Sequence, residues 1–189
     1  MADRELGIDY LEDPEVQAWE DNLDFVMETL SANNSYENGE LVKETGPGLL
    51  VVQLSNDSID EYASRMQLNP WDEEEEGYIH DDPGELYDLF RETSKQDGAV
   101  IITSNGRILP SNAYLEPPPE TAEAAESAPG TGAKHITASR ISTLDEVVYA
   151  KALSSADGGT TTYVNGEQMR TQEREEFADK WREENEEIE

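Results

Sequence analysis

The sequence contains no cysteine, few basic residues and no long apolar run. Without cysteine the chain can form neither a disulfide nor a thiolate metal site. The first residues, MADRELGIDYLEDPE, lack the basic and apolar regions of a signal peptide. No run approaches the roughly 20 apolar residues that a membrane helix needs. We therefore expect a cytoplasmic protein with no membrane segment and, at 189 residues, a single domain.

Basic residues are scarce relative to acidic ones. Lysine and arginine number 13 against 44 aspartates and glutamates, which gives a formal net charge of −31. No basic stripe is present, so the composition argues against nucleic-acid binding. This excess is typical of halophilic proteins, because the Debye length falls to about 3 Å at 1 M salt and self-repulsion is then screened. An acidic interaction protein is the alternative.

The apolar spacing predicts strands interleaved with helices. Asp13 and Pro14 start an amphipathic helix over 13–32, in which apolar residues recur at three- and four-residue steps. A second helix begins at Pro83. Further elements are expected as strands at 48–54, 146–153 and 160–164, short helices at 59–66 and 134–144, and a highly charged helix from Glu167 onward.

The centre of the chain, residues 99–115, has two apolar runs that flank Asn105-Gly106. This pattern predicts a hairpin with a type I′ turn, which needs a positive φ at both central residues. Strands that alternate with helices indicate an α/β fold: a single domain with a central twisted mixed β-sheet flanked by helices.

Two windows of the chain, 98–115 and 127–144, contain no carboxylate. A core hairpin accounts for the first window. The second contains GTGAKHITASRIS (130–142), which is polar and carries Lys134, His135 and Arg140. A glycine-rich loop that enters a helix presents free N–H groups and the positive end of the helix dipole, and both favour anions. The sequence therefore predicts a phosphate site here, while Arg140 is expected to pair with the acidic surface.

Asp97 lies at the edge of the first window, immediately before Gly98 and a buried strand. A carboxylate at this place suits a hard cation such as Mg²⁺ or Mn²⁺. The alternative is a turn aspartate in an Asp-Gly pair.

Together the two stretches resemble the diadenylate cyclase family. Asp97-Gly98-Ala99 matches its D-G-A motif, and Lys134 stands at the first arginine of its downstream G-T-R-H-R-A-A-x-x-I-S motif. The resemblance covers roughly residues 46–170. Other matches to the second motif are Gly132, His135, Ala138, Ile141 and Ser142; departures from the family pattern are Gln96, Ala133, Ile136, Ser155 and Ala156.

The resemblance implies a haloarchaeal, metal-dependent diadenylate cyclase. Such an enzyme condenses two ATP into cyclic di-AMP and two pyrophosphates, with Mn²⁺ or Mg²⁺, at the interface of two face-to-face protomers. Asp97 would hold the metal and share catalysis with His135. The implied nucleotide-binding residues are Gly98, Ala99, Gly132, Ala133, Lys134, His135, Ser142 and Ser154.

Two alternatives stay open at this point. One is a non-catalytic module of the same fold that binds a nucleotide or a cyclic dinucleotide. The other is an acidic interaction protein without a nucleotide site. In each case the expected organisation is an N-terminal helical segment (1–45), an α/β domain (46–166, with a flexible loop at 116–131) and an acidic C-terminal helix (167–189).

Overall fold

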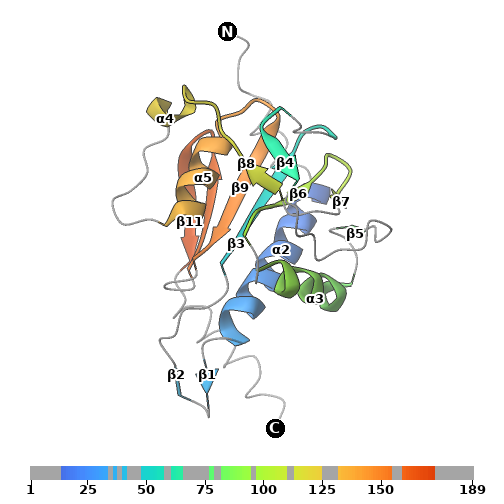
Figure 1. Ribbon diagram of the computed structural model, residues 1–189. Helices are drawn as coiled ribbons and strands as arrows, with labels where there is room; N and C mark the ends of the chain where they lie inside the picture. Colours follow the sequence, from blue (N-terminus) through green and yellow to red (C-terminus); the bar gives the residue numbers. More distant parts are fainter. Residues whose placement is uncertain are drawn as a thin grey trace.

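The computed structural model describes residues 14–33, 36–37, 40–41, 48–57, 61–65, 77–78, 82–94, 97–109, 113–124, 132–154 and 159–172. Figure 1 labels the elements along the chain. Their order is α2 (Pro14–Asn33), β1 (Tyr36–Glu37), β2 (Glu40–Leu41), β3 (Leu49–Leu54), β4 (Ala63–Arg65), β5 (Gly77–Tyr78), α3 (Pro83–Ser94), β6 (Val100–Ile102), β7 (Arg107–Ile108), β8 (Ala113–Leu115), α4 (Thr121–Ala124), α5 (Ala133–Ile141), β9 (Val147–Leu153), β10 (Thr160–Val164) and β11 (Glu167–Gln172).

The main sheet has seven strands in the order β11-β10-β9-β3-β6-β7-β5. Strands β3 and β6 run parallel, with Val51 opposite Val100, while β3 and β9 run antiparallel. The sheet is therefore mixed, and helices flank it as the sequence predicts. Two further pairs, β1 with β2 and β4 with β8, form separate two-stranded sheets.

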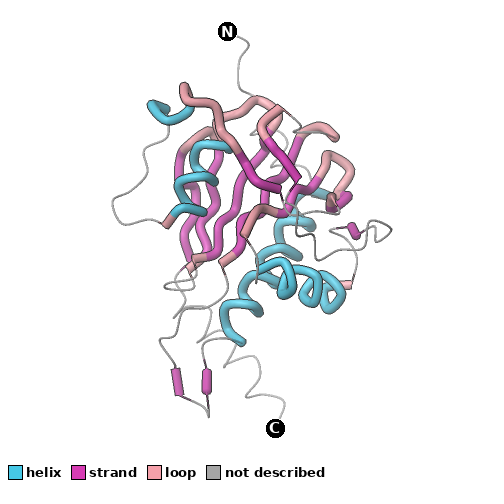
Figure 2. Tube along the Cα trace, in the orientation of Figure 1, coloured by secondary structure: helices cyan, strands magenta, loops and turns pink. Residues whose placement is uncertain are grey.

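Strand β3 lies at the centre of this sheet, and all six of its residues are buried. Because successive side chains of a strand point to opposite faces, it contributes to two separate cores. Leu49 and Val51 pack in a cluster with residues of α2 and α3. Leu50 and Val52 pack in a second cluster with residues of α5. Figures 1 and 2 show these helices on opposite faces of the sheet.

Helices α2 and α3 cover one face, as their apolar periodicity predicts. The stripe of α2 is buried, and Pro14 stands at its first residue, where a missing N–H costs nothing. Helix α3 begins at the predicted Pro83 and buries one side of its surface. The buried apolar residues of the two helices are Trp19, Leu23, Val26, Met27, Leu30, Leu86 and Phe90.

Helix α2 also contacts the sheet through a buried ion triad. Lys151, in the middle of β9, has a fully buried side chain. Its Nζ lies 3.2 Å from Glu20 Oε1 and also donates to Asp24 Oδ1. A buried ammonium is tolerated only when such partners compensate its lost hydration. The triad therefore joins the N-terminal helix to the sheet.

The structure corrects the predicted hairpin turn. Gly106 has a positive φ of 79°, but Asn105 does not. The Thr103 amide donates to Arg107 O and the Gly106 amide donates to Thr103 O, both at 2.9 Å. These bonds define a three-residue loop ending in a left-handed glycine, which is the other common way to close a tight hairpin.

Two predicted helices and part of a predicted loop are also wrong. Residues within 59–66 form strand β4, because they pair with β8 rather than with their own turn. Glu167–Gln172 form strand β11, which follows a turn at Asn165-Gly166 where both φ angles are positive (52° and 84°). In the predicted flexible loop, residues 116–124 include helix α4. The remainder of that loop (125–131) and residues 173–189 lie outside the described residues. None of the described helices is long and apolar enough to cross a membrane.

We predict that Lys151→Met lowers the free energy of unfolding by about 3 kcal/mol, because it removes the buried cation that the Glu20 and Asp24 carboxylates share. Chemical denaturation followed by circular dichroism measures this loss. The matched control adds Glu20→Gln and Asp24→Asn and recovers most of it. A loss below about 1 kcal/mol for the single variant would show that the triad is not a tight contact.

Candidate functional site

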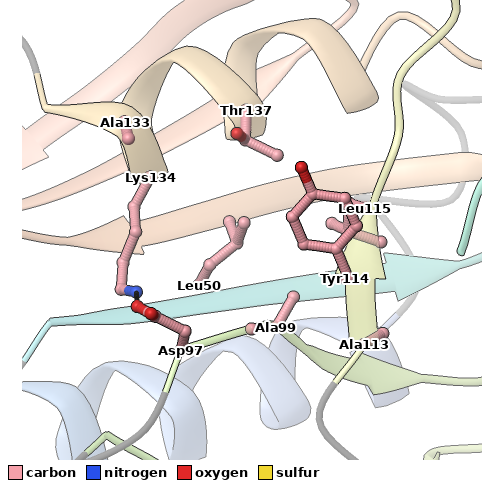
Figure 3. A pocket seen from close by; sticks show the side chains of 10 residues that line it. Leu50, Asp97, Ala99, Ala113, Tyr114, Leu115, Ala133, Lys134 and Thr137 are labelled. Carbon is pink, nitrogen blue, oxygen red and sulfur yellow. Dashed lines mark ion pairs between the residues drawn. The ribbon is translucent and has the colours of Figure 1, made fainter. Parts of the chain in front are cut away.

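One pocket brings together the two halves of the predicted site. It has a volume of about 240 Å³ and lies between the N-terminal half of α5, the residues that precede β6, and strand β8. Figure 3 shows Lys134 extending from α5 to Asp97, with the ring of Tyr114 on the other side of the pocket. The lining residues are Leu50, Asp97, Gly98, Ala99, Ala113, Tyr114, Leu115, Ala133, Lys134 and Thr137.

Asp97 and Gly98 form the turn that leads into β6. The Asp97 side chain is 94% exposed at the pocket, so its carboxylate is accessible to a ligand. Gly98 has a φ of 109°, a conformation that side-chain-bearing residues rarely adopt. Gly98 is therefore a backbone requirement of this turn, and the same turn presents the Asp97 carboxylate to the pocket.

Ala99 joins this turn to the outer wall of the pocket. Its amide donates to Ala113 O at 2.8 Å, and the Ala113 amide donates to Ala99 O at 2.9 Å. This antiparallel bridge holds β8 beside the start of β6. Because the Ala99 N–H is already used, the contribution of Ala99 to the pocket is its methyl group and not a free donor.

The N-terminus of α5 forms the polar end of the pocket. Gly132 is the N-cap, so the cap position itself has no side-chain hydrogen bond, and the first turn has no acidic residue. The space beside Gly132 is open, since a Cβ added there would meet no atom within 4 Å. Lys134, with a side chain 27% exposed, places its Nζ 4.0 Å from Asp97 Oδ1. A cation, free helix N–H groups and a carboxylate therefore meet at one place.

Strand β8 supplies residues that sequence reasoning missed. Ala113 and Leu115 are buried, while Tyr114 between them is 57% exposed and lines the pocket with Leu50 and Thr137. The signal was present in the sequence, because an aromatic residue between two buried small or apolar residues of a strand points away from the core. This side of the pocket is apolar and aromatic.

His135 lies elsewhere. Its side chain is only 8% exposed and does not line the pocket. Its Nδ1 lies 3.2 Å from the hydroxyl of Tyr163 in β10, and the two rings meet edge to face. Burial raises the pKa of Tyr163, so its hydroxyl stays protonated at neutral pH. The contact holds α5 against the sheet, with donor and acceptor set by the imidazole tautomer.

The two predicted serines are also outside the pocket lining. Ser142 is fully buried; its Oγ donates to Ser139 O at 2.8 Å and accepts from the Gly166 amide at 3.0 Å. It therefore connects the end of α5 to the turn before β11. Ser154 follows β9, and its amide donates to Gly159 O at 2.9 Å. Gln96, Ser155 and Ala156 lie outside the described residues.

Comparison with known proteins identifies the family of this chain. Residues 42–168 match the family model DAC, described as DisA bacterial checkpoint controller nucleotide-binding. The chain belongs to the DAC family. A diadenylate cyclase from Haloferax volcanii is 33% identical to it over 81 residues, which are 43% of this chain and 29% of that relative. The matched stretch is thus less than a third of the relative's length.

Solved structures of two other proteins share the DAC fold. A Bacillus cereus protein described as a hypothetical membrane spanning protein has a TM-score of 0.53 and 19% identity, covering 82% of this chain and 67% of that chain. A double mutant of DacA from Staphylococcus aureus has a TM-score of 0.51 and 16% identity, covering 89% of this chain and 96% of that chain. At these identities the likeness shows the fold alone.

The donor set of this DAC pocket fits a divalent cation that is shared with a ligand. Among the described residues no group of three or more His, Asp or Glu could enclose a metal ion. Asp97 nevertheless presents an accessible carboxylate at the pocket. Mg²⁺ is commonly held by one or two carboxylates together with waters and substrate phosphates. Asp97 supplies one such carboxylate, beside the N-terminus of α5.

We predict that Ser142→Ala lowers the free energy of unfolding by about 1–3 kcal/mol, because the buried Gly166 amide loses its acceptor. Thermal or chemical denaturation measures the loss, and an ATP titration of the same variant measures its affinity. An affinity within twofold of the wild-type value is expected. A large loss of affinity with unchanged stability would instead place Ser142 in the nucleotide site.

Proposed function

We propose that this chain is a diadenylate cyclase that condenses two ATP molecules into cyclic di-AMP with release of two pyrophosphates. The observation that carries the proposal is the meeting of Asp97, Lys134 and the N-terminus of α5 at one end of a pocket whose other end is apolar and aromatic. The two ends of a nucleoside triphosphate match the two ends of this pocket, because an anionic phosphate chain lies at one end of the molecule and a flat base at the other. Membership of the DAC family supports the proposal.

The polar end would bind the triphosphate. Lys134 supplies a positive charge, and the first turn of α5 supplies N–H donors that have no partner within the helix. The open space beside Gly132 allows a phosphate oxygen to approach the backbone closely. The contact between Lys134 and Asp97 is long and its carboxylate is almost fully exposed, so little free energy is lost when a phosphate and a cation replace it.

The apolar end would receive the adenine base. Tyr114 offers an exposed ring for stacking, and Leu50 and Leu115 offer aliphatic contact. Stacking of a base on an aromatic side chain contributes about 1–3 kcal/mol. The base would therefore set the orientation of the nucleotide, while the phosphates would be held at α5.

Asp97 would hold a divalent cation, Mn²⁺ or Mg²⁺, between its carboxylate and the triphosphate. Such a cation, when bound, neutralises charge that develops on the phosphate and lowers the pKa of a nearby hydroxyl. The cation also allows a carboxylate to lie beside a tetra-anionic substrate, which would otherwise be repelled.

The reaction requires two nucleotides. The 3′-oxygen of each ATP forms a bond to the α-phosphorus of the other, the bond from that phosphorus to the bridging α,β-oxygen breaks, and pyrophosphate leaves. The two hydroxyl protons pass to solvent or to a base. One nucleotide would occupy the described pocket, and the second would be brought to it by another copy of the chain that faces the first.

His135 would act on this chemistry indirectly. Its side chain contacts Tyr163 of β10, so it would fix the position of α5 and, through the helix, that of Lys134. We therefore propose it as a positioning residue in place of the direct nucleotide contact expected from the sequence.

One observation favours a second function, a module that binds nucleotides without turnover. Ile136 is 38% exposed in the first turn of α5, where a second cation is expected from the family motif. Fewer cations at the triphosphate would weaken the stabilisation of charge during phosphoryl transfer. Wild-type protein that binds ATP and forms no cyclic di-AMP would favour this module.

We predict that Asp97→Asn lowers kcat for cyclic di-AMP synthesis by at least about 100-fold, because the amide is a poor cation ligand. The fold is expected to survive, since this side chain is almost fully exposed. Product formation in molar KCl with Mn²⁺, measured by chromatography, tests this. Asp88→Asn on the exposed surface of α3 is the matched control. Equal rates for the two variants would remove Asp97 from the mechanism.

We also predict that Lys134→Gln raises KM for ATP about tenfold, which is the loss expected for one charge-assisted contact. Arg91→Gln, which removes an exposed cation from α3, is the control for the general effect of charge and is expected to leave KM unchanged. A KM for Lys134→Gln within twofold of the wild-type value would place the triphosphate away from α5.

A further inference from the structure

Arg140 makes an unusual set of contacts in the last turn of α5. Its Nε donates to Thr121 Oγ1 at 3.2 Å, and its Nη2 donates to Pro117 O at 3.0 Å and to Pro118 O at 3.1 Å. All three acceptors are uncharged. The chain has 44 acidic residues, yet no carboxylate in the part of the chain that the structure describes pairs with this arginine; the donors named above hold one segment, 117–121.

The contacts use the shape of the guanidinium as well as its charge. An arginine presents several N–H donors in one rigid plane, so it can hold two neighbouring carbonyls and a hydroxyl together, whereas a lysine ammonium is a point charge on a flexible stem. The segment adds its own bonds, since Thr121 Oγ1 donates to Pro118 O at 2.6 Å. Arg140 is thus the connection between a compact turn and α5.

This turn continues directly from the outer wall of the pocket. Strand β8 (Ala113–Leu115) lines the pocket with all three of its residues, and Glu116 and Pro117 follow it. At its start, β8 is held by the bridge between Ala113 and Ala99. At its end, the Glu116 amide donates to Tyr62 O at 2.8 Å, and the Arg140 contacts follow immediately.

The same helix carries the opposite wall. Lys134 and Thr137 line the pocket from the first two turns of α5, and Arg140 extends from its last turn. A rotation or shift of β8 relative to α5 would therefore change the separation between Tyr114 and Lys134. Outside the pocket, Arg140 connects α5 to residues 117–121, which follow β8, and these contacts oppose a shift of β8 relative to α5.

We propose that Arg140 is a positioning residue that fixes strand β8 against helix α5 and so sets the width of the nucleotide pocket. The inference rests on the proposed function for the identity of the ligand, a nucleoside triphosphate. Arg140 would act on affinity for the base end of the nucleotide rather than on the chemical step, because its hydrogen bonds go to residues 117–121 and it does not line the pocket.

The test is Arg140→Lys in the full chain, with Arg91→Lys on the surface of α3 as the matched control. The dissociation constant of α,β-methylene-ATP with Mn²⁺ is measured by calorimetry in molar KCl, together with KM and kcat for ATP. We expect the dissociation constant and KM to rise about fivefold, the effect of losing one hydrogen bond, while kcat stays within twofold. The control is expected to match the wild type.

A second variant, Thr121→Val, removes the hydroxyl acceptor without changing α5. It removes the contacts of this hydroxyl with Arg140 and with Pro118 O. It is expected to weaken binding in the same direction by about twofold, and its effect should not add fully to that of Arg140→Lys, since both loosen the segment 117–121. Hydrogen exchange provides a local measurement, because the Glu116 and Thr121 amides should exchange faster in both variants. Unfolding of Arg140→Lys would leave Thr121→Val to decide the question.

The outcomes separate this inference from the proposed function. Wild-type protein that binds the analogue without forming cyclic di-AMP contradicts the proposed reaction but leaves Arg140 to be judged by the dissociation constants. Unchanged dissociation constants in both variants, with or without a lower melting temperature, would show that Arg140 has a purely structural role. Wild-type protein that does not bind the analogue overturns both.

Discussion

The structure depends on the burial of β3 on both of its faces. A strand with no solvent-exposed face needs a cover on each side, and the chain supplies α2 and α3 on one face and α5 on the other. Helix α2 in the first cover supplies two carboxylates that compensate the charge of Lys151, in strand β9 of the sheet. The second cover begins at Ala133, above the side chain of Leu50, so its N-terminus and the residues before β6 enclose a pocket. The position of the candidate site thus depends on where α5 begins.

In a chain of net charge −31, three cations have distinct structural surroundings. Lys151 is buried in the core, Arg140 donates to carbonyl and hydroxyl groups, and Lys134 lies at the pocket. Because residues 127–144 contain no carboxylate, α5 itself brings no negative charge to the pocket or to its own N-terminus. This arrangement suits a polyanionic ligand, because repulsion by the rest of the surface is screened in concentrated salt. The acidic residue that does reach the pocket, Asp97, is suited to share a cation with that ligand.

Much of the fold was predictable because its signals are local. The apolar stripe of α2, the buried run of β3 and the start of α3 at Pro83 follow from periodicity and capping. The strand at 63–65 was missed because its partner is more than forty residues away, and β11 was missed because its charged residues resemble an exposed helix. A turn with a positive φ at both residues is found at Asn165-Gly166 rather than at the predicted Asn105-Gly106. For the site, Asp97, Gly98, Ala99, Ala133 and Lys134 lie at one pocket, and their binding roles stay predictions. The contact of His135 with Tyr163 depends on tertiary packing that no motif specifies.

The most direct test of the account is the reaction of the wild-type protein with ATP. Purified full-length chain is incubated with ATP and Mn²⁺ in molar KCl, and the products are separated and identified by mass. The account predicts one cyclic di-AMP and two pyrophosphates for every two ATP consumed, with a rate per chain that rises with protein concentration because two copies must meet. Bound ATP that is recovered unchanged, at every protein concentration, would contradict it.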